Sequence, residues 1–234
     1  MIRIVGISGS PRHGNTEILV QEALRVAGDA PVESDTHFVS LAGRRIEPCT
    51  DCQVCASQGR PCIKKDDWRA TIEEILSPIP DGLIVGSPVY FYGETALLRA
   101  LFERCTSLLK GYWVEDYPTP PPDLSRTAAA ALAVGYHRHG GVEHTVGSIL
   151  HWLMIMGCAC TGVDYLGGQG WQRIDGFDSV RDDAIGMRSA RASGRRVAYL
   201  AHLLKSGTEE AGERFDEMLR FRNLEEPHAS NPAS

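Results

Sequence analysis

The sequence feature that most restricts the fold is a regular alternation of short apolar runs with longer segments of helical periodicity. The apolar runs, which predict buried strands, are IRIVGIS (2–8), THFVSL (36–41), GLIVGSPVY (82–90), AAAALAVGY (128–136) and ACTGVDYL (159–166). The helical segments lie at 15–27, 68–76, 95–109, 144–156 and 182–205. Strands that alternate with helices in this way form a parallel sheet covered by helices on both faces. We therefore predict a doubly wound α/β fold with a five-stranded parallel sheet.

Three segments interrupt or follow this alternation. A cysteine-rich insertion at 47–67 follows the second predicted strand, inside a main domain that covers 1–207. The Pro-rich stretch VEDYPTPPPDLSR (114–126) predicts an extended surface insertion, which we expect near the ligand because it precedes the fourth strand. Residues 208–234 predict one charged helix, 209–222, and then a disordered tail of polar composition.

Charge and composition narrow the possible partners and the compartment. The net charge is −6 and there is no long run of Lys or Arg, so we expect no nucleic-acid partner. The start MIRIVGISGSP lacks the pattern of a signal peptide, and the most apolar stretch, 149–163, is interrupted by His151. We therefore expect no membrane span and a cytoplasmic protein, whose seven cysteines stay reduced.

The segment after the first predicted strand, GISGSPRHGNT, has the composition of a phosphate-binding loop. Its polar donors are Ser8, Ser10, Asn15 and Thr16. The following helix directs its N–H groups toward the same point, and Arg12 adds a forked, permanently charged donor. These features suit a phosphate monoester and differ from the dinucleotide and triphosphate motifs. The alternative is a plain Gly/Ser turn with a capping Asn.

The third predicted strand ends in SPVYFYGE, which carries three consecutive aromatic residues. Pro88 ends the strand, so Tyr90, Phe91 and Tyr92 reach the edge of the sheet where ligands bind in doubly wound folds. A flat heteroaromatic ring can lie against such a loop, with backbone groups contacting its polar edge. The alternative is that Tyr90 or Phe91 belongs to the core.

The fourth predicted strand ends in a second glycine-rich turn, GYHRHGGVEHT. Gly140 and Gly141 permit close approach of the backbone to a ligand. Arg138 or a backbone N–H in this turn could stabilise negative charge on a reduced ring. We interpret His137 and His139 as solvated loop residues rather than acid–base catalysts.

Four of the seven cysteines lie within fourteen positions, in a C-x2-C-x2-C-x6-C pattern. These residues are Cys49, Cys52, Cys55 and Cys62. The short gaps let successive thiolates surround one centre, and Gly59 and Pro61 allow the chain to return for the fourth ligand. The spacing resembles bacterial ferredoxins and predicts a single [4Fe–4S] cluster. A zinc site and an empty site are the alternatives, although four-cysteine zinc sites usually split into two separated pairs.

The other cysteines, Cys105, Cys158 and Cys160, are interpreted as small buried side chains. Three cations follow or border the cluster motif, namely Arg60, Lys64 and Lys65. They could offset the negative charge of a cluster or mark a docking surface for an acidic electron carrier. A solvated loop edge is the interpretation we favour for them.

In this order, GSPRHGNT, SPVYFYG, LLRALFER and VGYHRHGGVEHTVGSILHWLMIMG resemble the iron–sulfur flavoprotein family, in the NAD(P)H-dependent FMN reductase branch of flavodoxin-like proteins. The resemblance runs from about residue 2 to 205 and includes the cysteine motif. It implies a flavodoxin-like fold and bound FMN, with the phosphate at Ser8, Ser10, Arg12, Asn15 and Thr16. It also implies ring contacts from Pro88, Val89, Tyr90, Phe91 and the loop that contains Gly135, Tyr136, Arg138, Gly140 and Gly141.

Together these features predict an oxidoreductase that converts between two-electron and one-electron carriers, with NAD(P)H as a co-substrate and a small molecule or a ferredoxin-like protein as partner. The resemblance implies a homodimer or homotetramer in which the cluster approaches the flavin of another subunit. A cluster-free NAD(P)H-dependent reductase of flavin, quinone, azo or nitro compounds is an alternative. A non-catalytic redox or metal sensor is a second alternative.

Overall fold

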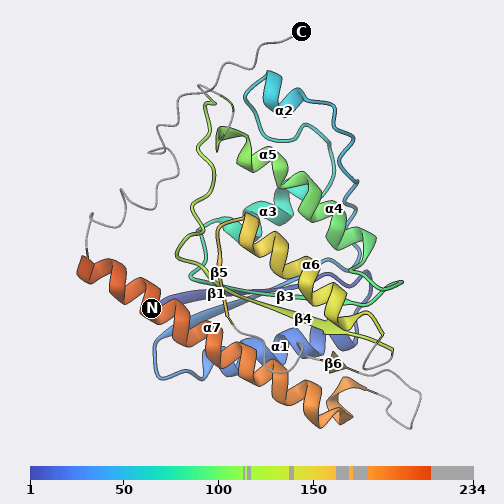
Figure 1. Ribbon diagram of the computed structural model, residues 1–234, viewed down its shortest axis with the longest axis vertical. Helices are drawn as coiled ribbons and strands as arrows, with labels where there is room; N and C mark the ends of the chain where they lie inside the picture. Colours follow the sequence, from blue (N-terminus) through green and yellow to red (C-terminus); the bar gives the residue numbers. More distant parts are fainter. Residues whose placement is uncertain (113, 115–116, 137–139, 162–168, 171–178, 212–234) are drawn as a thin grey trace.

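A parallel sheet between two layers of helices forms the centre of the computed structural model (Figure 1). The structure describes residues 1–112, 114, 117–136, 140–161, 169–170 and 179–211. The strands are β1 (Ile2–Ser8), β2 (Ser34–Ser40), β3 (Gly82–Pro88), β4 (Ala128–Val134), β5 (Ala159–Cys160) and β6 (Gln169–Gly170). The α-helices are α1 (Asn15–Gly28), α2 (Val54–Ser57), α3 (Trp68–Leu76), α4 (Ala96–Arg104), α5 (Thr106–Leu109), α6 (Val142–Ile155) and α7 (Ala184–Ala211). The predicted α/β fold is therefore confirmed.

The two helical layers bury different sets of apolar side chains. Helices α1 and α7 cover one face of the sheet, and α3, α4, α5 and α6 lie on the other (Figure 1). Leu19 of α1 and Val197 of α7 belong to the first core, whereas Trp68, Leu98 and Leu153 belong to the second. All five side chains are at most 1% exposed. Burial of apolar surface on both faces is what the near-continuous apolar strands predict.

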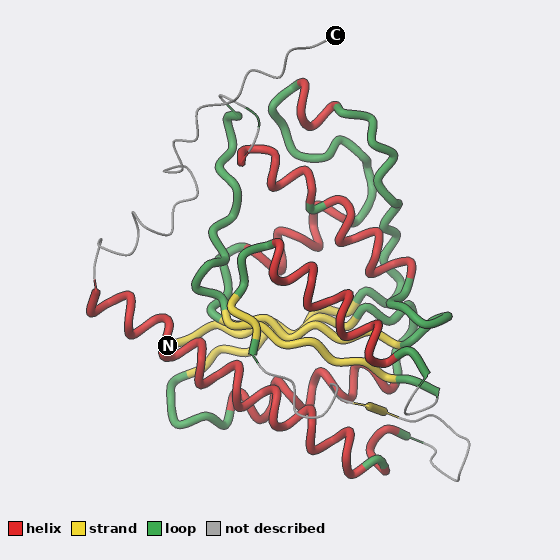
Figure 2. The backbone as a smooth tube through the Cα atoms, viewed as in Figure 1, coloured by secondary structure: helices red, strands yellow, loops and turns green. Residues whose placement is uncertain are grey.

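The strand order places a crevice at the carboxyl ends of β1 and β3. The order is β2-β1-β3-β4-β5, and every pair is parallel. Figure 2 shows the strands together between the helical layers. From β1 the chain moves to one side to form β2 and to the other side to form β3. Ligands of doubly wound sheets bind at the point where this direction changes. At that point Ser8 pairs with Ser40 on one side and with Gly86 on the other.

The edge beyond β4 differs from the predicted single fifth strand. Ala159–Cys160 pair with the start of β4, and Gln169–Gly170 pair with its end. Of the predicted strand 159–166, residues 162–168 lie outside the described residues. The apolar pattern did not predict β6, because a two-residue strand of Gln and Gly has no apolar periodicity.

Two predicted helices have different bounds in the structure. The helix predicted at 95–109 is divided into α4 and α5 at Cys105, and Thr95 caps α4 by accepting a hydrogen bond from the Leu98 N–H at 3.1 Å. Helix α7 continues to Ala211, so the start of the charged helix predicted at 209–222 belongs to it. The rest of that helix and the tail lie outside the described residues. No helix within the described part of the chain is long and apolar enough to cross a membrane.

The Pro-rich insertion packs beside the cysteine segment, not near the ligand crevice as we expected. Tyr117 and Leu124 are 6% and 1% exposed. The Tyr117 hydroxyl donates to the backbone carbonyl oxygens of Arg60 and Ser107, at 3.1 and 3.3 Å. The expectation was wrong because the segment precedes β4 and so lies at the amino end of that strand, whereas the crevice is at the carboxyl end.

Candidate functional site

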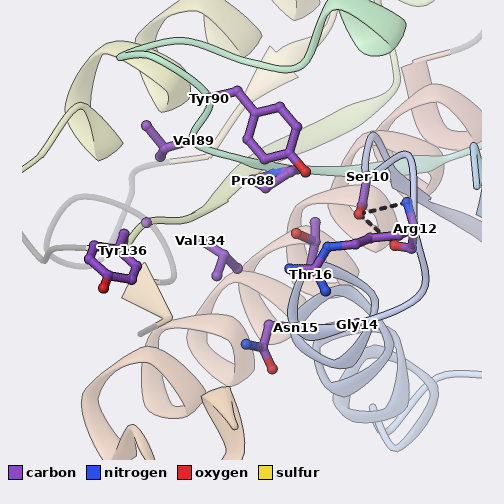
Figure 3. A pocket seen from close by; sticks show the side chains of 11 residues that line it. Ser10, Arg12, Gly14, Asn15, Thr16, Pro88, Val89, Tyr90, Val134 and Tyr136 are labelled. Atoms are coloured by element: carbon purple, nitrogen blue, oxygen red, sulfur yellow. Dashed lines mark hydrogen bonds between the residues drawn. The ribbon is translucent and has the colours of Figure 1, made fainter. Parts of the chain in front are cut away.

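A cavity of about 170 Å³ lies at the carboxyl ends of β1, β3 and β4 (Figure 3). Its lining comprises Ser10, Arg12, Gly14, Asn15, Thr16, Pro88, Val89, Tyr90, Val134, Gly135 and Tyr136. All three loops that the sequence singled out therefore contribute to one cavity. Nine of the predicted cofactor-binding residues are in this lining, and Gly14 and Val134 are additions to them. Ser8, Phe91, Gly140 and Gly141 do not line it.

The loop after β1 is held in a tight turn by its own hydroxyl groups. The Ser10 hydroxyl donates to the Arg12 carbonyl oxygen at 2.5 Å and accepts from the Arg12 N–H at 3.2 Å (Figure 3). Ser8 is fully buried below the turn and accepts from the Ser10 N–H at 3.4 Å. The turn thus places Ser10 and Arg12 at the cavity and leaves Ser8 to support the backbone.

The amino end of α1 opens toward this cavity without a side-chain cap. Gly14 occupies the N-cap position, and no side chain accepts a hydrogen bond there. The Asn15 side chain, which the plain-turn alternative treats as a cap, instead accepts from the Val180 N–H at 3.1 Å. Helix N-termini attract anions through unsatisfied N–H groups and the helix dipole. The geometry therefore favours an anion site over a capped turn.

Thr95 connects the loops after β1 and β3, although the sequence pattern predicted only that a helix begins at this residue. Its hydroxyl donates to the Gly9 carbonyl oxygen at 2.6 Å, and its N–H donates to the Ser87 hydroxyl at 3.2 Å. The residue is 1% exposed. The hydroxyl of Thr95 thus bonds the loop after β1 and its backbone N–H bonds the end of β3, so this one buried residue joins the two.

The aromatic loop after β3 forms a tight turn. The Tyr90 N–H donates to the Gly93 carbonyl oxygen at 2.8 Å, and the Gly93 N–H donates back to Tyr90 at 3.2 Å. Phe91 and Tyr92 have φ values of 49° and 72°, a backbone region that non-glycine residues rarely occupy. Tyr90 faces the cavity (Figure 3), whereas the Phe91 side chain at the tip is fully exposed.

The glycine-rich turn after β4 contributes in part to the cavity. Gly135 and Tyr136 are in its lining. Gly141 begins α6 with φ of 92°, and a Cβ at this position would lie 2.7 Å from the Tyr92 Cα. Gly141 therefore allows α6 to contact the aromatic turn rather than a ligand. Arg138, His137 and His139 lie outside the described residues.

A second, smaller cavity of about 40 Å³ lies between the cysteine segment and the end of α4. Cys49, Cys52, Cys55 and Cys62 all line it. From α4 and α5 the lining includes Glu103, Arg104, Thr106 and Ser107. Figure 1 shows α2, which contains Cys55, beyond α4 and α5 on the side away from the sheet. The two cavities share no lining residue.

The backbone between the first three cysteines turns sharply. Asp51 and Gln53 have φ values of 48° and 58°, so two non-glycine residues adopt left-handed conformations within three positions. Such conformations carry strain and concentrate at functional sites. The Asp51 N–H donates to the Cys49 sulfur at 3.4 Å, and the Cys49 N–H donates to the Glu103 carboxylate at 3.3 Å. The turn thereby brings Cys49 and Cys52 to the same cavity.

A buried ion pair closes the base of the cysteine segment. The Arg104 guanidinium donates to the Asp66 carboxylate, and the side chains of both residues are at most 2% exposed. Asp66 also accepts from the Glu47 N–H at 2.8 Å, and Arg104 donates to the Glu47 carbonyl oxygen at 3.4 Å. The guanidinium carbon lies 4.9 Å from the centre of the Trp68 ring. These contacts join the two ends of the predicted segment 47–67 to α4.

Burial and hydrogen bonding shift the pKa values of Asp66 and Arg104 in opposite directions. Burial raises the pKa of the Asp66 carboxyl, but the hydrogen bonds from Arg104, Glu47 and Trp68 outweigh it and lower the pKa below its usual value. Burial likewise works against the charge of Arg104, but Asp66 and the nearby Cys62 thiol raise its pKa. Both groups are therefore charged at neutral pH.

The three predicted cations have different positions. Lys64 lines the cysteine cavity and lies 3.5 Å from the Glu47 carboxylate. Arg60 and Lys65 are exposed and do not line it. The cation that lies deepest beside the thiols is Arg104, which the sequence interpretation missed. An Arg next to the apolar stripe of a predicted helix is the signal that could have identified it.

Of the remaining cysteines, Cys105 and Cys158 are buried as predicted, whereas Cys160 is half-buried and packs against the same core. Burial raises the pKa of Cys105 and of Cys158 to about 12, and it also raises the pKa of Cys160. Thiols of this kind stay protonated at neutral pH and are poor ligands. The four cysteines at the second cavity are exposed or half-buried, so they alone combine accessibility with proximity to one another within the described residues.

Comparisons with known proteins show the family to which the chain belongs. A family model described as NADPH-dependent FMN reductase matches residues 2–172. An iron–sulfur flavoprotein of Methanocaldococcus jannaschii is 36% identical over 211 residues, which cover 87% of this chain and 100% of that protein. An iron–sulfur flavoprotein of Methanosarcina thermophila is 32% identical over 206 residues, covering 87% of this chain and 97% of that protein.

Among solved structures, the fold is similar to that of RosB with bound 8-demethyl-8-formylriboflavin-5'-phosphate. The TM-score is 0.65 at 16% identity, and the match covers 93% of this chain and 88% of RosB. A structure of a WrbA-like flavodoxin from Agrobacterium tumefaciens has a TM-score of 0.54 at 13% identity, covering 87% of this chain and 99% of that one. At these identities the likeness concerns the fold, which is flavodoxin-like.

Proposed function

Because the chain belongs to the NADPH-dependent FMN reductase family, as one of its iron–sulfur flavoproteins, we propose that it transfers electrons between a two-electron and a one-electron carrier through FMN and a [4Fe–4S] cluster. Family membership makes the chain a flavin-dependent oxidoreductase. The observation that carries the proposal is the presence of two separate cavities, one lined by the phosphate-type loop and one by four cysteines.

The chemistry of the residues that line the first cavity supports FMN as its ligand. Ser10, Arg12 and the uncapped amino end of α1 offer hydroxyl, guanidinium and amide donors to a phosphate monoester. Tyr90 and Tyr136 supply aromatic surface at the opposite side of the cavity, where Pro88 and Val89 add apolar contacts. We assign the phosphate to the loop after β1 and the ring to the loops after β3 and β4.

We interpret the second cavity as the site of a cluster rather than of a single zinc ion, on the spacing of its cysteines. Zinc sites of four cysteines usually split into two separated pairs, whereas these cysteines follow one another in a C-x2-C-x2-C-x6-C pattern that resembles bacterial ferredoxins. The four thiols border one cavity, although no group of three or more His, Cys, Asp or Glu side chains among the described residues is arranged to hold a metal ion. Cys49, Cys52, Cys55 and Cys62 would hold the cluster, and the buried Arg104 offers positive charge beside it.

When bound, the flavin accepts a hydride and the cluster passes single electrons. The protein supplies binding and electrostatics, and no side chain is required as acid, base or nucleophile. Ser10 and Arg12 hold the phosphate, and Tyr90 and Tyr136 border the space left for the ring and for a nicotinamide donor. NADH and NADPH are both candidate donors, and a small molecule or a ferredoxin-like protein is the proposed acceptor.

We further propose a homodimer or homotetramer. Within one chain, α4 and α5 lie between the cysteine segment and the sheet (Figure 1), and the two cavities share no residue. A neighbouring subunit could bring its cluster closer to the flavin than this arrangement allows. Size-exclusion chromatography with light scattering should detect the oligomer, and a monomer under native conditions would contradict this part of the proposal.

Metal and flavin analysis of protein purified without oxygen tests the proposal. We expect about four iron and four sulfide per chain, FMN, little zinc and a visible spectrum with overlapping flavin and iron–sulfur absorption. Iron-free protein with FMN that oxidises NADPH or NADH would instead identify a cluster-free reductase. Protein that binds flavin but oxidises neither nucleotide would support a sensor.

A further inference from the structure

Arg104 contains the most deeply buried unpartnered polar atoms near the cysteine cavity. Its side chain is 0% exposed, and its Nε and Nη2 atoms have no hydrogen-bond partner among the described residues. Nη1 donates to Asp66 and Glu47, and the Cys62 side chain also interacts with the guanidinium. Buried N–H groups without acceptors cost about 1–3 kcal/mol each, and more when the donor is charged. A native protein keeps such groups when an acceptor completes the site.

The position of Arg104 indicates where that acceptor lies. The residue lines the cavity that the four cysteines also line, and the Cys62 thiol is close enough to act on its charge. The opposite edge of the guanidinium is bonded to Asp66, and its central carbon lies over the Trp68 ring, 4.9 Å from the ring centre. The guanidinium therefore cannot rotate to satisfy Nε and Nη2 elsewhere without losing the contacts that hold it.

We propose that Nε and Nη2 of Arg104 donate hydrogen bonds to sulfur atoms of the cluster, at Cys62 or at an inorganic sulfide, and that Arg104 thereby positions the cluster and raises its reduction potential. This inference rests on the proposed cluster. A cluster with four thiolate ligands is negatively charged, and reduction adds a further negative charge. A buried cation with N–H groups directed at sulfur stabilises the reduced form more than the oxidised form.

Arg104 is more deeply buried than the three cations that the sequence analysis considered, Arg60, Lys64 and Lys65. Arg60 and Lys65 are exposed, so water and salt screen their charges from the cavity. Lys64 is half-buried and pairs with Glu47 at 3.5 Å. Arg104 has little access to water and keeps unused donors, which makes its effect on the potential the largest of the four.

Two variants separate the charge of Arg104 from its hydrogen bonds. Arg104→Lys keeps the positive charge but loses the planar set of guanidinium N–H donors, and Arg104→Gln removes the charge. Lys65→Gln is the matched control, because it removes an exposed charge from the same segment. Iron content, the rate of iron loss to a chelator and the midpoint potential from an anaerobic EPR titration are measured for each. Circular dichroism and FMN binding verify the fold.

We expect loss of iron to become about tenfold faster in Arg104→Gln, with a lower midpoint potential, and smaller effects of the same sign in Arg104→Lys. Lys65→Gln should resemble the wild type. Unchanged potential and iron retention in both Arg104 variants would overturn the inference while leaving the cluster proposal intact. A wild-type protein without iron and sulfide would overturn the cluster proposal and, with it, this inference.

A measurement on the wild type keeps the inference testable if both variants fail to fold. Protein labelled with ¹⁵N-arginine is reduced, and hyperfine coupling between the cluster spin and ¹⁵N is recorded by pulsed EPR. Arg104 is the arginine among the described residues that line the cavity, so we expect coupling of the size that a direct N–H···S contact gives. Loaded, reduced protein without such coupling would contradict the inference.

Discussion

The two cavities are built by different means. The cavity at the sheet edge is formed by three loops that begin at buried strands, and the hydroxyl and backbone N–H of the buried Thr95 join two of them. The cysteine cavity contains no strand, and its four thiols lie in a segment whose only helix, α2, has four residues. The core thus fixes the first cavity, whereas a few polar contacts and the proposed cluster hold the second.

The polar contacts of the cysteine segment come from three parts of the chain. Asp66 and Arg104 join its ends to α4, and Tyr117 of the Pro-rich insertion bonds to the Arg60 carbonyl oxygen. A Cβ at Gly59, which has φ of 57°, would lie 2.7 Å from the Pro118 ring. The insertion therefore packs against the cysteine segment. From this contrast we expect changes at one cavity to leave the other unaffected.

The largest expected difference between the two cavities comes from Cys52→Ser, which should remove iron from one and leave FMN in the other. We expect the variant to lose nearly all iron, because a hydroxyl is a poor replacement for a thiolate ligand, while FMN content stays close to that of the wild type. Iron and FMN analysis of anaerobic preparations measures both. Cys160→Ser is the control and should keep its iron. Full iron occupancy in Cys52→Ser would refute the ligand assignment, and concurrent loss of FMN would refute the independence of the cavities.

The reciprocal test is Arg12→Gln at the sheet-edge cavity. Loss of a charge-assisted contact to phosphate should weaken FMN binding about tenfold or more, with little effect on riboflavin, which has no phosphate. Fluorescence titration of flavin-depleted protein gives both dissociation constants, and iron content should not change. Arg188→Gln, an exposed position on α7, is the control. Equal weakening of FMN and riboflavin would show that Arg12 does not contact the phosphate.

A smaller effect should follow from Tyr117→Phe, which removes the hydroxyl that donates to Arg60 and Ser107. The loss of about 1 kcal/mol should accelerate iron release to a chelator about fivefold without changing FMN affinity. Tyr199→Phe on α7, where the side chain is exposed, is the control. Iron release at the wild-type rate would show that the insertion does not stabilise the cysteine segment.

The smallest expected effect is on the free energy of unfolding, through an ion pair in the helical layer formed by α1 and α7. Glu22 of α1 accepts from Arg25 at 2.9 Å and from Arg191 of α7 at 2.5 Å, and the hydrogen bond from Arg25 is the main cause that lowers its pKa from 4.5 to about 2. A lowered carboxyl pKa stabilises the fold above pH 4.5, and this stabilisation is lost as the pH falls toward 2.

Glu22→Gln should therefore reduce the free energy of unfolding by about 1 kcal/mol or less at pH 7. The difference from the wild type should shrink as the pH is lowered below 4.5. Urea unfolding across this range measures it, with Glu33→Gln as an exposed control. A difference that grows with acidity would contradict the assigned pKa shift. Iron retention at pH 7 should be unaffected.

The sequence predicted the sheet-edge region well because its determinants are local. Apolar runs and helical periods located β1, β3, β4, α1, α3 and α6 to within a few residues. The polar composition of the loop after β1 identified a cavity that the structure contains. These properties depend on residues close to one another in the sequence, which pattern analysis can read.

For the cysteine region, the sequence predicted which thiols come together but not which residues of other segments pack beside them. The motif spacing identified four thiols that line one cavity, but it could not show that Arg104, 42 positions after Cys62, lies beside them. Nor did it show that the Pro-rich insertion packs on the segment rather than near the ligand crevice. Both facts depend on how α4 and the insertion pack in three dimensions. Likewise, the full exposure of Phe91 follows from the backbone of its turn.

The central claim is that both cofactors are present and exchange electrons. The most direct test adds NADPH to anaerobic wild-type protein and follows flavin absorbance and the EPR spectrum in the same sample, with NADH and Cys52→Ser in parallel. We predict that flavin absorbance falls and an iron–sulfur signal appears in the wild type, whereas the variant shows only the flavin change. A wild type whose flavin is reduced while no iron–sulfur signal develops would contradict the claim.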